Sequence, residues 1–200
     1  MGQSGPGRWP TEEECLGLLR RAGCSESVIR HVRLTQRIAA VIADRINSRG
    51  EGPSGPGKGR TGGGVSVDTG LVLAGALLHD IGRGRTHGVR HALAGAELAR
   101  ELGLPEELQL IIERHLGAGI EQQEAIKMGL PPKDYIPLTL EEKIIAHADN
   151  LSGRNGKVRL RDVVEDLKRK GVHHIIPRME ALHRELSGLC GMDLDDIEVR

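Results

Sequence analysis

Aromatic side chains are almost missing from this chain of 200 residues. Phenylalanine is absent, and Trp9 and Tyr135 are the only tryptophan and tyrosine. Proteins that stack nucleic-acid bases need such rings, so this chain has little with which to stack them. A folded core must therefore be built from aliphatic side chains, and leucine, isoleucine and valine are frequent enough to form one.

The chain also lacks net charge and long apolar runs. Its 28 Lys and Arg residues balance 28 Asp and Glu residues, and no long basic run occurs. This balance argues against a dedicated nucleic-acid binder and against a protein of anionic membrane surfaces. No apolar run approaches the roughly 18 residues of a membrane helix. The first residues show no apolar segment of a secretory signal, so we expect no membrane association.

Cysteine is scarce. The three cysteines, Cys15, Cys24 and Cys190, are scattered, odd in number and without a CxxC pair. This usage fits reduced, structural thiols in a reducing compartment. We therefore expect a cytoplasmic protein.

The periodic segments that remain are helical, and we see no convincing strand. Thr11 with Glu14, and Thr139 with Glu142, have the spacing of capping boxes at helix starts. A long helix is predicted from Ser25 to about residue 47, and an all-apolar, buried helix over residues 71–79. The fold class is therefore all-α, a helical bundle.

One segment interrupts the bundle. Residues 49–64 contain eight glycines and two prolines, so we predict a flexible loop over residues 49–66. Helices over residues 161–170 and 177–189 follow the main bundle, and they could pack on it or on another subunit. We predict one domain over residues 1–200, with its core at about 12–152 and a C-terminal helical extension at 153–200. A homo-oligomer is left open.

Ionisable side chains lie on or at the ends of apolar helix faces. Burying such a group costs several kcal/mol unless it is paired or bound to a metal. Imidazoles and carboxylates that converge between helices are how bundles build metal sites. A mixed His/Asp set suits Mn, Fe, Co, Ni or Zn better than Ca. The predicted ligands are His31, His79, Asp80, His91, His115 and Asp149.

The order of these residues and the sequences around them resemble the HD superfamily of metal-dependent phosphohydrolases. The match consists of His31, the phrase LLHDIGR around His79 and Asp80, and EEKIIAHADNL around Asp149. It runs from about residue 12 to 152. The resemblance implies an HD-domain helical bundle in which these four side chains hold a primary divalent ion.

A second ion is implied by two further histidines. His91 in HALAGAELA and His115 in IIERH match the extra histidines of binuclear HD proteins, in which the residue at Asp80 bridges both ions. The cofactors are then one or two divalent ions of Mn, Fe, Co, Ni, Mg or Zn. The implied activity is hydrolysis of a phosphate mono- or diester by a metal-activated hydroxide. The partner would be a small phosphorylated substrate, with a nucleotide as one candidate.

The predicted catalytic residues are Asp80, Arg83 and Lys143. Arg83 and Lys143 would offset the growing charge on the phosphoryl oxygens, and Arg85 and Arg90 are further candidates for phosphate contact. An arginine has too high a pKa to donate a proton readily, so Arg83 is not expected to protonate a leaving group. The chain lacks a Gly-Tyr-Pro signature, which gives no ground for a cyclic-dinucleotide substrate. The alternative is a non-catalytic regulatory module that binds a metal or nucleotide.

Several other polar residues are expected to have no role in the site. His147 lies about 200° around its helix from Asp149 and is expected to pack elsewhere. His87, His183, Glu113 and Arg114 are expected to be solvated.

Overall fold

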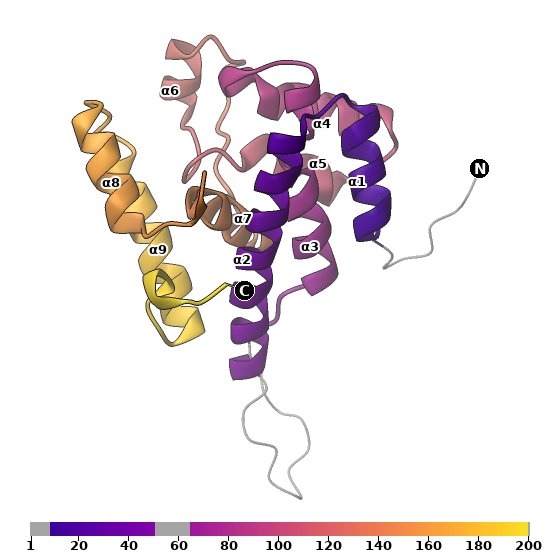
Figure 1. Cartoon of the computed structure of the whole chain (residues 1–200). Helices are drawn as coiled ribbons and strands as arrows, with labels where there is room; N and C mark the ends of the chain where they lie inside the picture. The colour runs from indigo at the N-terminus through magenta and orange to yellow at the C-terminus, as the bar shows by residue number, and fades with distance from the viewer. Residues whose placement is uncertain (1–8, 51–64, 200) are drawn as a thin grey trace, which may run out of the picture.

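The computed structural model describes residues 9–50 and 65–199, and these fold as a bundle of helices (Figure 1). The all-α prediction is confirmed. The helices are α1 (Glu12–Arg21), α2 (Glu26–Gly50), α3 (Thr69–Leu78), α4 (His91–Glu101), α5 (Glu106–Arg114), α6 (Gln122–Lys127), α7 (Leu140–Asn150), α8 (Leu160–Arg169) and α9 (Ile176–Cys190). Short 3₁₀ turns are η1 (Ile81–Gly84), η2 (Gly88–Arg90) and η3 (Leu194–Asp196).

Helix α3 is the centre of the bundle and packs against α1, α2, α5 and α7. Asp68 caps its start by accepting a hydrogen bond from the Leu71 N–H. Gly75 allows a close approach, because a Cβ there would lie 2.6 Å from Cδ1 of Ile145 and 3.0 Å from Cδ1 of Ile111. The helix ends at His79, and Asp80 leaves helical geometry at φ −100° and ψ 13°. The His-Asp pair therefore sits inside the bundle.

The C-terminal helices pack on the same molecule. Helix α9 contacts α2 and α7, and α8 contacts α9 (Figure 1). Leu182 and Leu186 of α9 belong to the main hydrophobic core. The C-terminal extension therefore packs on the bundle of its own chain. The sequence had left open whether it packs there or on another subunit.

The expectation of no strand was wrong. A two-residue antiparallel hairpin pairs β1 (Ser152–Gly153) with β2 (Gly156–Lys157) directly after α7. Strands this short carry no readable period. Because Gly153 pairs with Gly156, the two-residue turn is Arg154-Asn155.

The predicted loop at 49–66 lies largely outside the described residues. Helix α2 continues to Gly50, three residues beyond its expected end, so the first two residues of the predicted loop are helical. Residues 51–64 are not described. None of the described helices combines the length and apolar character that a bilayer crossing requires.

The Thr11–Glu14 capping box is present as predicted. At the second predicted box only half forms. Thr139 accepts from the Glu142 N–H, but the Glu142 carboxylate accepts from the Leu138 N–H and contacts Arg114 instead.

Candidate metal centre

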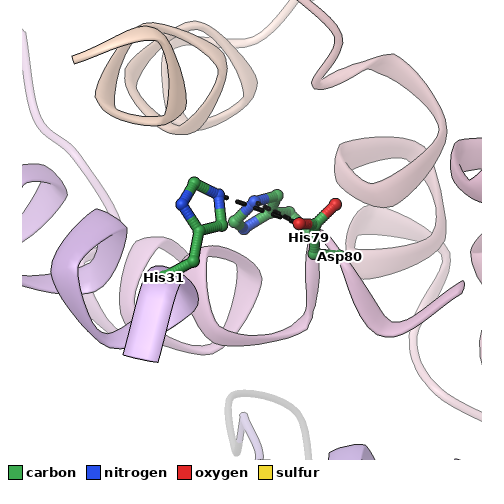
Figure 2. A group of neighbouring side chains, drawn as sticks. All are labelled: His31, His79 and Asp80. Carbon is green, nitrogen blue, oxygen red and sulfur yellow. Dashed lines mark ion pairs between the residues drawn. The ribbon is translucent and has the colours of Figure 1, made fainter. Parts of the chain in front are cut away.

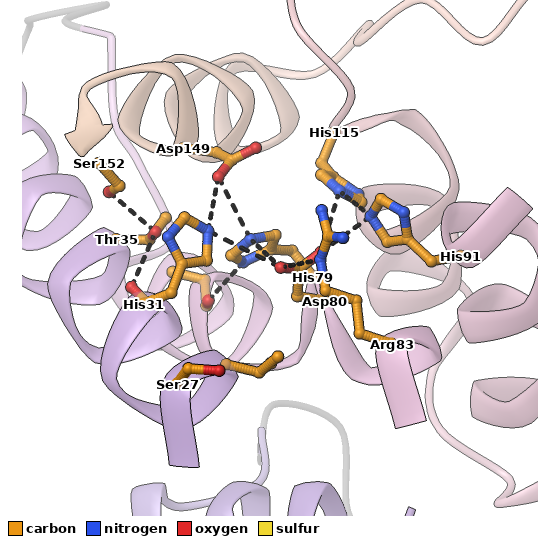
Figure 3. A network of polar contacts seen from close by, with 12 residues as sticks. Ser27, His31, Thr35, His79, Asp80, Arg83, His91, His115, Asp149 and Ser152 are labelled. Atoms are coloured by element: carbon orange, nitrogen blue, oxygen red, sulfur yellow. Dashed lines mark hydrogen bonds and ion pairs between the residues drawn. The ribbon is translucent and has the colours of Figure 1, made fainter. Parts of the chain in front are cut away.

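All six predicted ligands meet between the helices (Figure 3). His31 comes from α2, and His79 and Asp80 from the end of α3. His91 begins α4, His115 ends α5, and Asp149 lies near the end of α7. Segments far apart in sequence therefore contribute to one cluster.

Three of the histidines are fixed by the same device. Nδ1 of each ring contacts the backbone carbonyl oxygen three residues earlier: His79 to Ala76 at 2.7 Å, His115 to Ile112 at 2.8 Å, and His91 to Gly88. A carbonyl can only accept, so Nδ1 carries the proton in each neutral ring. Nε2 is then left with a lone pair that points into the cluster. This is the tautomer in which a histidine binds a metal through Nε2.

The lone pairs of His91 and His115 face each other. Their Nε2 atoms are 3.1 Å apart, and the rings are buried. Two acceptors at this distance repel unless a cation or a proton lies between them or beside them. The pair is therefore suited to a shared cation.

Asp80 presents one carboxylate oxygen to each half of the cluster. Its Oδ1 lies 2.8 Å from Nε2 of His91 and 3.6 Å from Nε2 of His115. Its Oδ2 lies 3.7 Å from Nε2 of His31 and 3.8 Å from Nε2 of His79 (Figure 2). A carboxylate placed in this way can contact two neighbouring ions.

Asp149 completes the half that contains His31 and His79. Its Oδ1 lies 2.8 Å from Nε2 of His31 and 3.5 Å from Nε2 of His79. The His31 and Asp149 side chains are 28% and 20% exposed, whereas those of His79 and Asp80 are 0% and 2% exposed. The cluster therefore opens to solvent at His31 and Asp149.

Two buried polar atoms of the cluster have no hydrogen-bond partner among the described residues, namely Nε2 of His79 and Oδ1 of Asp80. Such atoms are costly to bury. A divalent cation would satisfy both, because it accepts electron pairs from imidazole nitrogen and carboxylate oxygen. Overlapping trios of ligand atoms lie within 4.8 Å of one another: His31, His79 and Asp80; His79, His115 and Asp149; and Asp80, His91 and His115. The donor set fits the predicted divalent ions, and with no cysteine among the donors it is not a thiolate zinc site.

The pKa shifts of the metal-free cluster also favour the binding of a cation. Burial acts to raise the pKa of Asp80 and Asp149, but neighbouring histidines outweigh it and hold both below the ordinary aspartate value. Burial acts to lower the pKa of His79, but Asp80 and Asp149 raise it to about 9, so without a metal this ring carries a second proton on Nε2 near pH 7, which a bound cation would replace. Burial lowers the pKa of His115 to about 3, with His79 adding to the effect. The carboxylates thus stay ionised, and the negative charge attracts a cation.

Arg83 stands at the edge of the cluster. Its Nε donates to Oδ2 of Asp80, and its side chain is 33% exposed (Figure 3). It can therefore touch both Asp80 and a ligand arriving from solvent.

The other predicted cations lie apart from the cluster. Lys143 donates from Nζ to Glu185 of α9 at 2.7 Å, Arg85 pairs with Glu101, and Arg90 donates to the Gly129 carbonyl. Within the described part of the chain, no hydrogen bond or ion pair joins Lys143 to the six ligands. A catalytic role for Lys143 stays a prediction.

Sequence reasoning missed one ion pair beside the site. Arg114, expected to be solvated, donates from Nη1 at 3.2 Å to the Glu142 carboxylate, which is 3% exposed. This pair joins α5 to α7 next to His115. Glu113 is 11% exposed and pairs with Lys133, so it too was wrongly expected to be solvated. The partners are 20 or more residues apart, and no local pattern marks such pairs.

His183 was also wrongly expected to be solvated. It is 11% exposed and links two residues, with Nδ1 3.0 Å from Nε2 of His147 and Nε2 2.8 Å from Oδ1 of Asp193. His147 is buried and points away from the cluster toward α9, as its helical position predicted. His87 is exposed.

Comparison with known proteins gives several relatives. The chain is 42% identical over 188 residues to a tRNA (cytidine(56)-2'-O)-methyltransferase of Picrophilus torridus, covering 94% of this chain and 50% of that protein. It is 46% identical over 179 residues to an uncharacterised protein of Methanocaldococcus jannaschii, covering 88% of this chain and 97% of the other. Ribonuclease Y of Acidothermus cellulolyticus is 28% identical over 190 residues, covering 94% of this chain and 30% of the enzyme. The chain thus spans about half the length of the methyltransferase it matches.

Among solved structures, the HD domain of the phosphodiesterase PgpH from L. monocytogenes, in complex with cyclic-di-AMP, has the same fold. The TM-score is 0.51 at 16% identity, with 92% of this chain and 99% of that chain covered. The family model of the HD domain matches residues 28–154, which include all six predicted ligands. The chain therefore belongs to the HD domain family.

Proposed function

We propose that the protein is a metal-dependent phosphohydrolase that cleaves a phosphate mono- or diester. One observation carries the proposal: the Nε2 lone pairs of His91 and His115 point toward each other, and Oδ1 of Asp80 lies beside them. In the neutral rings the proton is on Nδ1, so no proton lies between the two Nε2 atoms. A divalent ion would occupy that position. Membership of the HD domain family and the phosphodiesterase with the same fold support the same activity.

The residues divide into two ligand sets that share Asp80. His31, His79, Asp80 and Asp149 would hold one ion, and Asp80, His91 and His115 the other. When bound, such ions supply positive charge and lower the pKa of water, which makes a nucleophile available near pH 7. The metals that fit are Mn, Fe, Co, Ni, Mg and Zn.

The chain itself positions the substrate. The phosphate would enter at the open edge beside His31 and Asp149, because the other ligands are buried. The Arg83 guanidinium, held by Asp80, would bind non-bridging phosphoryl oxygens and offset their growing charge. A nucleotide is the substrate class we favour, since the phosphodiesterase with the same fold was solved with a cyclic dinucleotide. The free, buried cysteines support a reducing, cytoplasmic setting.

Substrate profiling tests the proposal. Protein stripped with a chelator and reloaded with Mn²⁺ is offered p-nitrophenyl phosphate, bis-p-nitrophenyl phosphate, and nucleoside mono- and cyclic phosphates. Turnover that requires the metal and is lost in Asp80→Asn, but kept in the surface variant Lys168→Gln, supports the proposal. The preferred ester then separates phosphatase from phosphodiesterase.

A non-catalytic regulatory module is the second candidate. It is favoured by the relative that is 42% identical, since the chain matches half of a protein named for methyl transfer rather than for hydrolysis. This candidate predicts metal binding and stabilisation by nucleotides without turnover of any ester in the panel.

A further inference from the structure

We propose that the solvent face of α2 binds the phosphate backbone of a single-stranded polynucleotide that extends from the metal centre. The inference rests on the proposed function, since it names the substrate class of that site. The surface, called here the α2 arginine face, consists of Arg30, Arg33, Arg37, Arg45 and Arg49.

Charge is concentrated on this helix. The chain as a whole is neutral, but α2 carries five arginines against two acidic residues, Glu26 and Asp44. All five arginines are exposed. Only Arg33 has an acidic partner among the described residues, at 3.5 Å from Glu12. By contrast, Arg85, Arg114 and Arg178 are neutralised by carboxylates. Guanidinium groups without internal partners are available to external phosphates.

The face has the shape of a row. At 1.5 Å per residue, Arg30 and Arg37 are about 10 Å apart, and the row from Arg30 to Arg49 is about 28 Å long. Arg30, Arg33 and Arg37 are separated by three and four residues, so they share one side of the helix, while Arg45 and Arg49 lie about 60° and 100° farther round it than Arg30. One strand of nucleic acid presents a phosphate roughly every 3.4 Å along a helix axis. The row is therefore long enough for several phosphates.

The row begins at the metal centre. Arg30 immediately precedes His31, one of the two predicted ligands at the open edge of the cluster, although consecutive residues of a helix point about 100° apart. In Figure 1, α2 runs along the near side of the molecule toward the C-terminus. A strand whose reacting phosphate lay at His31 and Asp149 would meet Arg30 first, and it would have to follow the surface of α2 round the helix to meet Arg33 and Arg37.

The far end of the row is hollowed. Arg45 and Arg49, together with the acidic Asp44, line a surface depression of about 430 Å³ beside Cys190 and Gly191. Gly191 adopts φ +68°, and a Cβ there would lie 2.1 Å from Nη1 of Arg49. The glycine thus leaves room for the Arg49 guanidinium at the surface. A polyanion could be accommodated beside both arginines.

Single strands fit this site better than duplexes, and the binding would not depend on sequence. The predicted ligands other than His31 and Asp149 are buried, so the reacting phosphate must approach the cluster beside these two residues. With Trp9 and Tyr135 as the only tryptophan and tyrosine, recognition would fall on phosphates and not on stacked bases. The balanced composition hid this surface, because arginines spaced by three, four and eight residues do not form a run.

The test compares two double variants that remove the same charge. Arg30→Gln/Arg37→Gln alters the face, and Arg100→Gln/Arg184→Gln removes two exposed arginines of α4 and α9 that form no ion pair with an acidic residue among the described residues. The probe is a fluorescent 12-nucleotide oligomer, made as RNA and as DNA. Binding is measured by anisotropy between 50 and 200 mM KCl, with circular dichroism as a check on folding.

The α2 variant should bind about tenfold more weakly at 50 mM KCl. The slope of log affinity against log salt should fall by about 1.4, since each lost phosphate contact on a single strand removes roughly 0.7. The control variant should match the wild type. Preference for RNA or DNA identifies the sugar, and either preference supports the proposal.

Equal slopes in the two variants, no binding by the wild type at 50 mM KCl, or tighter binding of a duplex of the same length would each overturn it. Hydrolysis of p-nitrophenyl phosphate by the wild type is measured in parallel. If the ester is hydrolysed but the salt slopes of the two variants are equal, only the role of the α2 arginine face is rejected. If the ester is not hydrolysed, the proposed function is rejected whether or not the oligomer binds.

Discussion

Nε2 of His91 lies 3.1 Å from Nε2 of His115, while Nδ1 of each ring is held against a backbone carbonyl oxygen. Both nitrogens that face each other are therefore acceptors in the neutral rings. A cation relieves this repulsion and also satisfies Oδ1 of the buried Asp80. The arrangement predicts that metal contributes to the stability of the fold.

Chelation should lower the unfolding temperature. An ion at one hundred times its Kd stabilises the native state by about 2.7 kcal/mol. Removing it with EDTA should lower the Tm by several degrees, and adding Mn²⁺ should restore it. His91→Ala should reduce this metal-dependent shift because one ligand is lost. A Tm that is identical with EDTA and with excess Mn²⁺ would count against a metal centre.

Gly82 keeps η1 in contact with α4. A Cβ at this position would lie 2.0 Å from the His91 carbonyl oxygen and 2.5 Å from the Gly95 nitrogen, both of them backbone atoms that cannot turn aside. Gly82→Ala should therefore push Asp80 away from His91, lower the affinity for Mn²⁺ at least tenfold and destabilise the protein by about 2 kcal/mol.

Gly188→Ala on α9 is the matched control. Nothing lies within 4 Å of a Cβ there. Alanine favours a helix over glycine by about 0.5–1 kcal/mol, so this variant should be as stable as the wild type or more so. Calorimetry and metal titration measure both variants, and equal effects of the two substitutions would refute the packing role of Gly82.

The Arg114–Glu142 pair should stabilise the junction of α5 and α7. Glu142 is buried, so Arg114→Met leaves its charge without its ion partner. Removing one member of a fully buried pair costs about 3–5 kcal/mol. Arg114 is 19% exposed and Glu142 keeps the bond from the Leu138 N–H, so about 2 kcal/mol is expected here. Adding Glu142→Gln to Arg114→Met should recover part of the loss in urea unfolding. A double variant less stable than either single variant would contradict this reasoning.

His147 should make the fold sensitive to acid. Burial, with the charge of His183, lowers its pKa from 6.5 to about 3 in the folded state. Between these values the unfolded chain binds a proton that the folded chain does not, so stability present above pH 6.5 is lost as the pH falls toward 3. His147→Gln removes the titrating group, and its amide can still reach His183.

The two proteins should therefore diverge in acid. From pH 7.5 to 5.5 the wild type should lose about 1.4 kcal/mol more of its unfolding free energy than His147→Gln. Chemical denaturation at several pH values gives the comparison. Parallel curves would show that His147 is not protonated on unfolding in this range.

The convergence of the six predicted ligands could be predicted because each lies at a place that local patterns mark. His79 and Asp80 end an all-apolar helix, His91 starts an inward-facing stripe, and Asp149 ends a capped helix. Helix periodicity and the HD resemblance therefore indicate that these residues face one another between the helices. The all-α fold followed from the same periodicity.

What could not be predicted depends on contacts between distant segments. Arg114 finds Glu142 across 28 residues, and His147 finds His183 across 36. Lys143 shares a helix with Asp149, but its partner is Glu185 of α9, whose packing no motif specifies. The arginines of α2 were visible in the sequence, but their lack of acidic partners became clear only from the fold.

Metal content of Asp80→Asn is the most direct test of the central claim. Asparagine keeps the shape of Asp80, which contacts both halves of the cluster, but removes its charge and one oxygen ligand. Protein dialysed against Mn²⁺ is analysed by inductively coupled plasma mass spectrometry, with circular dichroism to confirm folding. We predict about two ions per chain in the wild type and fewer than one in the variant. Equal metal content in two folded proteins would contradict a centre built around Asp80.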